Sequence, residues 1–400
     1  MALLQLPSEA RPLIIARALR AFVDGFICIL LPAYLLALGL GAFEVGVLSA
    51  TTLLGSATFT LLLGAHGHRF HHRRLFLGAA LLMAATGILF ANLSSFWPLL
   101  LVAFVGTLNP SSGDVSVFLP LEHARLAEAA QGDARTRLFA HFTLAGALFA
   151  ALGSLAAGLP DLLVDQGWDK ADALRFMFLL YALAGGVVWL LYRRLPEPPP
   201  HQLPAPPAPL KASRSIVIRL ATLFSIDAFA GGLVLNSLLA LWLFQRFDLS
   251  LAAAGLFFFW AGLLSAFSQL AAPVVAKRIG LINTMVFTHI PSSVFLILAA
   301  LADSLPWALG LLLARAALSQ MDVPTRSAFV MAVVTPTERA AAASLTAVPR
   351  SLAAVVSPSL GGALFAAGWL AAPLIACGVL KIAYDLAIWR AFRGVDSRGA

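Results

Sequence analysis

The run LIIARALRAFVDGFICILLPAYLLAL, residues 13–38, decides the fold class of this 400-residue chain. Its 26 residues are enough for an α-helix to cross a lipid bilayer with some tilt. Three of them are charged, Arg17, Arg20 and Asp24, although each charge near the bilayer centre costs at least about 2.5–3.5 kcal/mol. Arg20 and Asp24 are four residues apart and can partly neutralise each other. Two interpretations stay open at this point: a salt bridge that helps the helix to insert, or a charged site on a transport path.

The composition indicates an integral membrane protein. Hydrophobic residues make up 60% of the chain and charged residues only 12%, against about 25% charged in ordinary soluble proteins. A net charge of +8 would also suit a nucleic-acid-binding protein, but the basic residues lie in short loops between apolar runs, which argues against that class. Cys28 and Cys377 both fall in apolar runs, so neither a disulfide framework nor a metal–cysteine site is indicated.

The apolar runs and the polar segments between them predict twelve membrane-spanning helices. The predicted spans are residues 13–38, 44–64, 75–94, 97–119, 138–159, 174–192, 216–244, 251–275, 283–302, 306–330, 339–366 and 369–390.

The distribution of basic residues predicts the orientation. If the N-terminus is cytoplasmic, 19 of the 27 Lys and Arg residues fall in cytoplasmic segments. Only Lys170, Arg175 and Arg246 fall in segments on the opposite side of the membrane, and the remaining five lie inside predicted spans. This bias predicts that both termini are cytoplasmic and that the chain is a multi-pass protein of the plasma (inner) membrane.

A proline-rich segment divides the chain. Residues 193–215 contain LPEPPPHQLPAPPAPLKASRS, which is typical of an extended, semi-rigid linker. The predicted domains are a six-helix bundle at 1–192, the linker at 193–215 and a second six-helix bundle at 216–400.

The two halves resemble each other in sequence. FVDGF at residues 22–26 aligns with SIDAF at 225–229, which places Asp24 over Asp227. Further along, Arg69 aligns with Arg278, and Asp114 aligns with Asp322. Two pseudo-symmetric six-helix bundles predict an all-α secondary transporter with a central site where the halves meet.

The loop after the second span carries a family resemblance. Its sequence GAHGHRFHHRR, residues 64–74, resembles the G-x-L-A-D-R-x-G-R-R-R signature of the major facilitator superfamily. His68 stands where the family usually has Asp, and the second copy at 276–280 keeps Arg278 but also lacks the acid. The resemblance implies the fold of that family over essentially the whole chain.

The same resemblance implies a cytoplasmic gate. The expected gate residues are Arg69, Arg73, Asp114, Arg278 and Asp322, with Arg69–Asp114 and Arg278–Asp322 as symmetric pairs. Two alternatives stay open for the loop: a basic turn that only sets the orientation, or a metal site formed by its four histidines. The metal site is disfavoured because the loop offers no carboxylate or thiol partner.

In the family, helices one, four, seven and ten line the central cavity. The expected substrate-binding and coupling residues are Arg20, Asp24, Asn109, Asp227 and Arg315 on those helices, together with Arg350 in the middle of the eleventh span. Asp24 or Asp227 is expected to carry a coupling proton, and Asp227 more readily because no cation lies within four residues of it. Arg315 and Arg350 favour an anionic or zwitterionic solute, because a guanidinium group binds a carboxylate through two parallel hydrogen bonds.

Three further residues are interpreted as structural. Lys381 and Asp385, four residues apart on the twelfth span, are predicted to pair with each other, and His289 is predicted to be a satisfied packing residue. Arg315, Ser319, Asp322 and Arg326 are predicted to form one polar stripe along a continuous tenth helix.

Together these features predict a secondary transporter that moves a small organic anion or zwitterion by alternating access, with proton-coupled export favoured by the resemblance. The alternatives are a proton-coupled multidrug antiporter, a lipid flippase, a channel and a membrane enzyme. The sequence shows no P-loop, nucleophile–base set or metal-ligand spacing, so we predict no enzymatic activity, cofactor or metal. The expected partners are the solute, protons and membrane lipid, with no nucleic acid and a monomeric protein.

Overall fold

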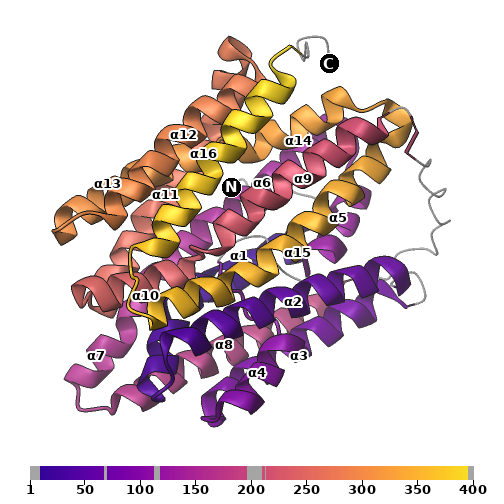
Figure 1. Cartoon of the computed structure of the whole chain (residues 1–400). Helices are drawn as coiled ribbons and strands as arrows, with labels where there is room; N and C mark the ends of the chain where they lie inside the picture. The colour runs from indigo at the N-terminus through magenta and orange to yellow at the C-terminus, as the bar shows by residue number, and fades with distance from the viewer. Residues whose placement is uncertain (1–9, 67–69, 112–117, 196–209, 212, 395–400) are drawn as a thin grey trace. The chain divides into compact units, whose positions relative to one another are not determined.

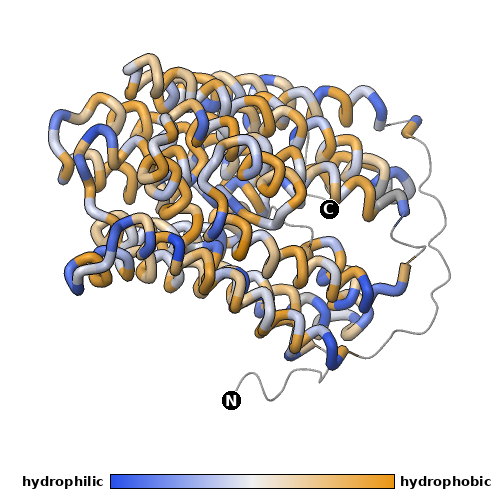
Figure 2. The backbone as a smooth tube through the Cα atoms, turned by 90° about the horizontal axis from the view of Figure 1, so that it is seen from below, coloured by the Kyte–Doolittle hydropathy of each residue, from blue (hydrophilic) through white to orange (hydrophobic). Residues whose placement is uncertain are grey.

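The structure, a computed structural model, describes residues 10–66, 70–111, 118–195, 210–211 and 213–394. Within these ranges every regular element is a helix (Figure 1). Eight helical segments of the described chain are long and apolar enough to cross a membrane. Hydrophobic residues follow most of each helix, and hydrophilic residues gather at helix ends and turns (Figure 2). The predicted all-α membrane fold is confirmed, while the count of twelve spans stays a prediction.

The helices group into two compact units, which are described separately here. The first unit contains the helices up to α8 together with α10 and the beginning of α11, up to Phe259. Their bounds are α1 Ala10–Ala37, α2 Ala42–His66, α3 His72–Asn92, α4 Phe96–Val105, α5 Phe118–Ala129, α6 Gly132–Leu155, the 3-10 turn η3 Ala156–Gly158, α7 Leu159–Asp165, α8 Lys170–Arg193 and α10 Asn236–Phe247.

The second unit contains α9, the rest of α11 from Trp260, and the helices that follow. Their bounds are α9 Arg214–Gly232, α11 Leu251–Ile279, α12 Leu281–Ala300, α13 Leu305–Ser319, α14 Asp322–Val333, the 3-10 turn η4 Pro336–Glu338, α15 Arg339–Ala366 and α16 Ala372–Phe392. The predicted domain boundary at 193–215 stays a prediction.

Three predicted spans are not single helices. In span 97–119 the helix α4 ends at Val105. Span 216–244 is divided between α9 and α10, and span 306–330 is divided between α13 and α14. At the first break Gly106 takes an extended conformation, with φ −76° and ψ −170°. Short polar stretches accompany two of these breaks, NPSSGD at 109–114 and SQMD at 319–322, but the apolar residues on both sides keep the averaged hydropathy that of a continuous span, so hydropathy alone misses the breaks. As a result, Ser319 and Asp322 lie on different helices, and the predicted stripe along one continuous tenth helix is wrong.

The N-terminus of α9 is fixed by a distant carboxylate. Glu338 accepts hydrogen bonds from the backbone N–H groups of Lys211, at 2.7 Å, and Ser213, at 2.9 Å. The Ser213 hydroxyl accepts another from the Thr335 N–H at 3.2 Å. A negative charge at a helix N-terminus satisfies free N–H groups and complements the helix dipole. This contact determines where α9, which carries Asp227, begins.

Glycines set the close approach of α1 and α6. A Cβ atom at Gly153 of α6 would lie 1.8 Å from the Phe22 carbonyl oxygen of α1, and one at Gly25 would lie 2.1 Å from the Ala150 carbonyl oxygen. Small residues allow helix backbones to come this close in membranes. The contact holds α1, and with it Arg20 and Asp24, against α6.

A Gly153→Ala variant is therefore expected to be less stable than the wild-type protein. The added methyl group meets backbone rather than a movable side chain, and overpacking of this kind costs about 1–3 kcal/mol or more. Thermal unfolding of the purified protein in detergent measures the effect. Gly186→Ala in α8 is the control, since no atom lies within 4 Å of a Cβ atom there. Equal stability of the two variants would contradict the packing argument.

Candidate functional site

Each unit contains a buried charge cluster. In the first unit, Arg20 of α1 forms an ion pair with Glu122 of α5, and their side chains are 3% and 0% exposed. The second Glu122 oxygen, Oε1, accepts a hydrogen bond from the Tyr192 hydroxyl of α8 at 2.6 Å. The Arg20 guanidinium also lies over the Phe118 ring, 4.1 Å from its centroid. We call Arg20, Asp24, Asn109, Glu122 and Tyr192 the N-terminal cluster.

Asp24 lies one turn from Arg20 but has different neighbours. The Asn109 side chain hydrogen-bonds to its carboxylate, and Arg17 and Tyr181 are close enough to interact with it electrostatically. The Asn109 Oδ1 atom accepts hydrogen bonds from the backbone N–H and the hydroxyl of Ser111, at 3.1 and 2.8 Å, which leaves its amide nitrogen for Asp24. The structure thus brings three predicted site residues, Arg20, Asp24 and Asn109, into one region.

In the second unit, Asp227 of α9 lies between two cations. Its Oδ1 atom is 2.7 Å from Lys381 Nζ of α16, and its Oδ2 atom is 3.0 Å from Arg326 Nη2 of α14. The same Arg326 nitrogen pairs with Asp322. No cation lies within four residues of Asp227 in the sequence, but tertiary contacts supply two, which removes the reason for expecting Asp227 to take up a proton more readily than Asp24.

The cluster continues through a histidine. His289 of α12 is 3.0 Å from Asp385 of α16 through Nδ1, and its Nε2 atom is 3.3 Å from Lys381 Nζ. The predicted Lys381–Asp385 pair is corrected, since Lys381 pairs with Asp227 and Asp385 pairs with His289. His289 is part of the charged network and not a simple packing residue. We call Asp227, His289, Asp322, Arg326, Lys381 and Asp385 the C-terminal cluster.

The two clusters are built on the same pattern of helices. Positions of α8 and α16 correspond at a spacing of 200 residues, and in both helices an arginine lies over a tryptophan: Arg193 over Trp189 and Arg393 over Trp389. At this spacing Tyr181, near Asp24, corresponds to Lys381, which pairs with Asp227. The repeat carboxylates therefore have matching positions but different partners.

Arg315 of α13 and Arg350 of α15 are also in the second unit. The Arg315 side chain is half-buried and the Arg350 side chain is exposed. Within the described residues neither arginine makes an ion pair or a side-chain hydrogen bond. Arg350 nevertheless lies close enough to Asp227 and Arg326 to interact with them electrostatically. These two guanidinium groups are available to an anionic ligand.

The predicted gate residues have mixed outcomes. Arg69 and Asp114 lie outside the described residues, so their pairing stays a prediction. Arg73 donates a hydrogen bond to the Arg193 carbonyl oxygen at 2.7 Å. Arg278 is exposed at the end of α11, whereas Asp322 is buried and pairs with Arg326. The structure therefore shows no Arg278–Asp322 pair. The Asp322 carboxylate is instead paired with Arg326, one turn away on the same helix.

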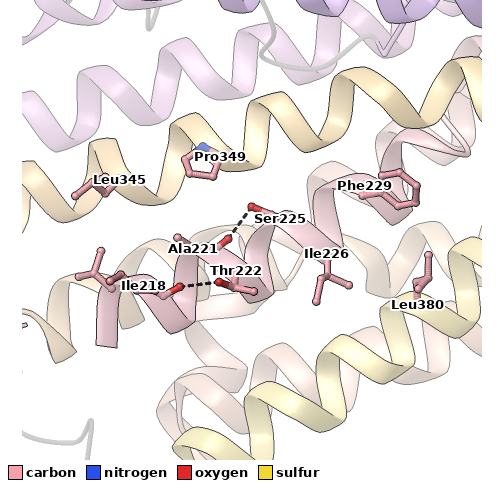
Figure 3. A pocket seen from close by; sticks show the side chains of 10 residues that line it. Ile218, Ala221, Thr222, Ser225, Ile226, Phe229, Leu345, Pro349 and Leu380 are labelled. Atoms are coloured by element: carbon pink, nitrogen blue, oxygen red, sulfur yellow. Dashed lines mark hydrogen bonds between the residues drawn. The ribbon is translucent and has the colours of Figure 1, made fainter. Parts of the chain in front are cut away.

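The second unit also has an apolar cavity of about 650 Å³ between α9, α15 and α16 (Figure 3). Its walls include Ile218, Ile226, Phe229, Leu345 and Leu380. Two hydroxyls line it, Thr222 and Ser225, but both donate to carbonyl oxygens of their own helix, at 3.0 and 2.7 Å. The cavity therefore offers hydrophobic contact and few free polar groups.

Sequence reasoning found Asp24 and Asp227, the repeat carboxylates of the two clusters, but missed most of the residues that pair with their neighbours or with them. Glu122 and Tyr192 were not expected at the site, and Lys381, Asp385 and His289 were given structural roles. Glu122 lies in a polar segment that looks like a loop, yet it is fully buried on α5. The correspondence of Tyr181 and Lys381 in the repeat was one signal that could have placed Lys381 beside Asp227.

Comparison with known proteins agrees with the all-helical fold. The model of the family described as Major Facilitator Superfamily matches residues 13–321. The chain belongs to the major facilitator superfamily. The match ends just before α14, so Arg326, Lys381 and Asp385 lie beyond it.

Individual relatives of this superfamily member are distant. An uncharacterized membrane protein of Saccharomyces cerevisiae, YJR124C, is 26% identical over 404 residues, covering 92% of this chain and 90% of its own length. The nucleoside transporter NupG is similar in structure with a TM-score of 0.73 at 15% identity, covering 96% of this chain and 99% of NupG. A D-xylose–proton symporter gives 0.73 at 15% identity, covering 96% and 98%. The human organic anion transporter MFSD10 gives 0.60 at 18% identity, covering 94% and 99%. At these identities the structures support the fold, and the chain is a multi-pass membrane transporter of the superfamily.

Proposed function

We propose that this transporter is a secondary active carrier that exports a small organic anion or zwitterion across the plasma membrane in exchange for protons. The observation that carries the proposal is the pair Arg315 and Arg350, which have no carboxylate partner among the described residues. A guanidinium group binds a carboxylate through two parallel hydrogen bonds. One of the similar structures is named as an organic anion transporter, which agrees with this substrate class.

Proton coupling is proposed from the ionisable groups inside the helices. Such groups are costly in a membrane and are characteristic of substrate and proton pathways. Asp24 and Asp227 occupy matching positions in the repeat, with an amide and a phenol near the first and two cations beside the second. Different partners allow the two carboxylates to serve different steps. One of the similar structures is named as a proton symporter, which supports proton use within this fold.

The direct experiment uses purified protein in sealed liposomes with a pH gradient. The solute panel contains small carboxylates, amino acids, sugars and the lipophilic cation tetraphenylphosphonium. Export in exchange for protons predicts that liposomes with an acidic lumen accumulate carboxylates through the protein molecules whose cytoplasmic side faces outward. The accumulation should be saturable and should depend on the pH gradient. Sugar flux alone, or a flux that rises linearly with concentration, would argue against the proposal.

Arg315→Ala and Arg350→Ala are expected to lower carboxylate kcat/KM by about 10- to 100-fold each, because a hydrogen bond to a charged group is worth about 1.5–3 kcal/mol. Initial rates of carboxylate flux measure this. Arg246→Ala, an exposed arginine at the end of α10, is the control and should leave the rate unchanged. Wild-type rates in both arginine variants would remove the anion proposal.

The apolar cavity favours a second candidate, a proton-coupled multidrug antiporter. Hydrophobic walls of this size suit an amphipathic, drug-like molecule. Flux of tetraphenylphosphonium that depends on Phe229 and Ile226, with no carboxylate flux, would favour this function over anion export.

A further inference from the structure

The C-terminal cluster forms an unbroken chain of charged and hydrogen-bonded groups. In order, the contacts join Asp385 to His289, His289 to Lys381, Lys381 to Asp227, Asp227 to Arg326, and Arg326 to Asp322. The chain draws on α9, α12, α14 and α16. The network holds three buried aspartates and two cations, and buried ionisable groups of this kind in a membrane protein are characteristic of proton and substrate pathways.

The hydrogen-bond geometry assigns the protonation state of His289. A lysine ammonium group can only donate, so His289 Nε2, 3.3 Å from Lys381 Nζ, must accept. The proton of the neutral ring is then on Nδ1, which donates to Asp385 Oδ1 at 3.0 Å. His289 is therefore neutral, and Asp385 holds it in this tautomer. A buried carboxylate on Nδ1 also stabilises the imidazolium that would form if Nε2 took up a proton.

A proton on Nε2 is incompatible with the Lys381 contact. The atom would become a donor facing another donor, and two positive charges would lie about 3.3 Å apart. Lys381 is also the member most able to move. Its side chain is 14% exposed, whereas those of Asp227, Arg326, His289 and Asp385 are 8% exposed or less.

His289 itself contacts Lys381, Tyr384 and Asp385 of α16. The other helices packed against α12 carry Arg315 on α13 and Asp322 and Arg326 on α14, and Asp227 on α9 is joined to His289 through Lys381. Among the described residues, the second Asp385 oxygen, Oδ2, has no hydrogen-bond partner, so this carboxylate keeps one acceptor position for a positively charged or protonated neighbour.

We propose that His289 is a proton-binding site that exchanges with Lys381. When a proton binds Nε2, the Lys381 ammonium leaves His289 and loosens its pair with Asp227; when the proton leaves, Lys381 returns. No covalent bond changes, and Lys381 keeps its own proton throughout. The inference rests on the proposed proton coupling and identifies His289 as the group whose protonation acts on Asp227 through the movement of Lys381.

The test uses the proton itself as the ligand. Full-length protein in liposomes is taken through a step in pH, and infrared difference spectra record imidazole and carboxylate bands. The wild-type protein is expected to show imidazole protonation together with a change in an aspartate carboxylate band that disappears in Asp227→Asn. The carboxylate signal, and the part of the imidazole signal that His289 contributes among the eight histidines, should be lost in His289→Gln, whose amide can accept from Lys381 and donate to Asp385 but cannot take up a proton. His141→Gln, an exposed histidine on α6, is the matched control and should keep both.

A second variant separates proton binding from the exchange. Lys381→Met should keep the imidazole band but lose the coupled carboxylate change. An Asp227 signal that persists in His289→Gln or in Lys381→Met would overturn the inference. If the wild-type spectra are as expected but the liposomes carry no solute under a pH gradient, the proposed function fails while the His289 exchange stands.

Discussion

A Glu122→Leu variant is expected to unfold about 5 °C below the wild-type protein. Glu122 is fully buried and takes both the Arg20 guanidinium and the Tyr192 hydroxyl. Removing it leaves a buried positive charge without its carboxylate, and breaking a buried ion pair in this way costs about 3–5 kcal/mol. Thermal unfolding of the purified protein in detergent gives the measurement.

The double variant Arg20→Leu/Glu122→Leu is expected to recover most of this loss, because two apolar side chains of similar size replace the pair without an unpaired charge. Asp172→Leu is the control. Its pair with Arg175 lies at 2.9 Å, but the Arg175 and Asp172 side chains are 36% and 60% exposed, and exposed pairs contribute about 0–1 kcal/mol. A double variant as unstable as Glu122→Leu would show that packing, rather than the unpaired charge, causes the loss.

The fold could be predicted from the sequence because the bilayer imposes a strong pattern. Apolar runs of span length and basic loops identify most helices and the family, and α15 begins and ends at the predicted residues 339 and 366. The breaks at Gly106 and after Ser319 could not be predicted in the same way. They depend on backbone geometry, and the polar residues beside them, such as Ser319 and Asp322, equally suit a polar stripe on one continuous helix.

The site was predicted in part, and the limit is a matter of distance along the chain. Asp24, Asn109 and Asp227 carry their own signal, since a polar residue in an apolar helix is visible locally. Their partners are not. Lys381 is 154 residues from Asp227, and Glu122 is 102 residues from Arg20. A spacing of four residues suggested that Lys381 pairs with Asp385, but Lys381 pairs with Asp227 of α9 and Asp385 pairs with His289 of α12.

An Asp227→Asn variant is expected to lose pH-gradient-driven transport and to be markedly less stable than Asp24→Asn. Asp227 is the shared partner of Lys381 and Arg326, so its loss leaves Lys381 without a carboxylate and weakens the hold on Arg326. Arg20, the cation one turn from Asp24, is already paired with Glu122, so Asp24→Asn leaves that cation neutralised. Thermal unfolding and liposome flux of both variants give the comparison, with Asp303→Asn in an exposed turn as the control.

The decisive comparison removes the cation together with the carboxylate. Asp227→Asn/Lys381→Met should regain stability, because Arg326 keeps Asp322 and no lysine is left unpaired. It should not regain coupled transport, since Lys381, which exchanges with the proton on His289, and its partner Asp227 are both gone. Recovery of stability without transport would assign the Asp227–Lys381 pair to the mechanism. Recovery of both stability and transport would show that the pair is structural and is not used in the transport cycle. An Asp227→Asn variant as stable as Asp24→Asn would contradict the arrangement of Asp227 between two cations.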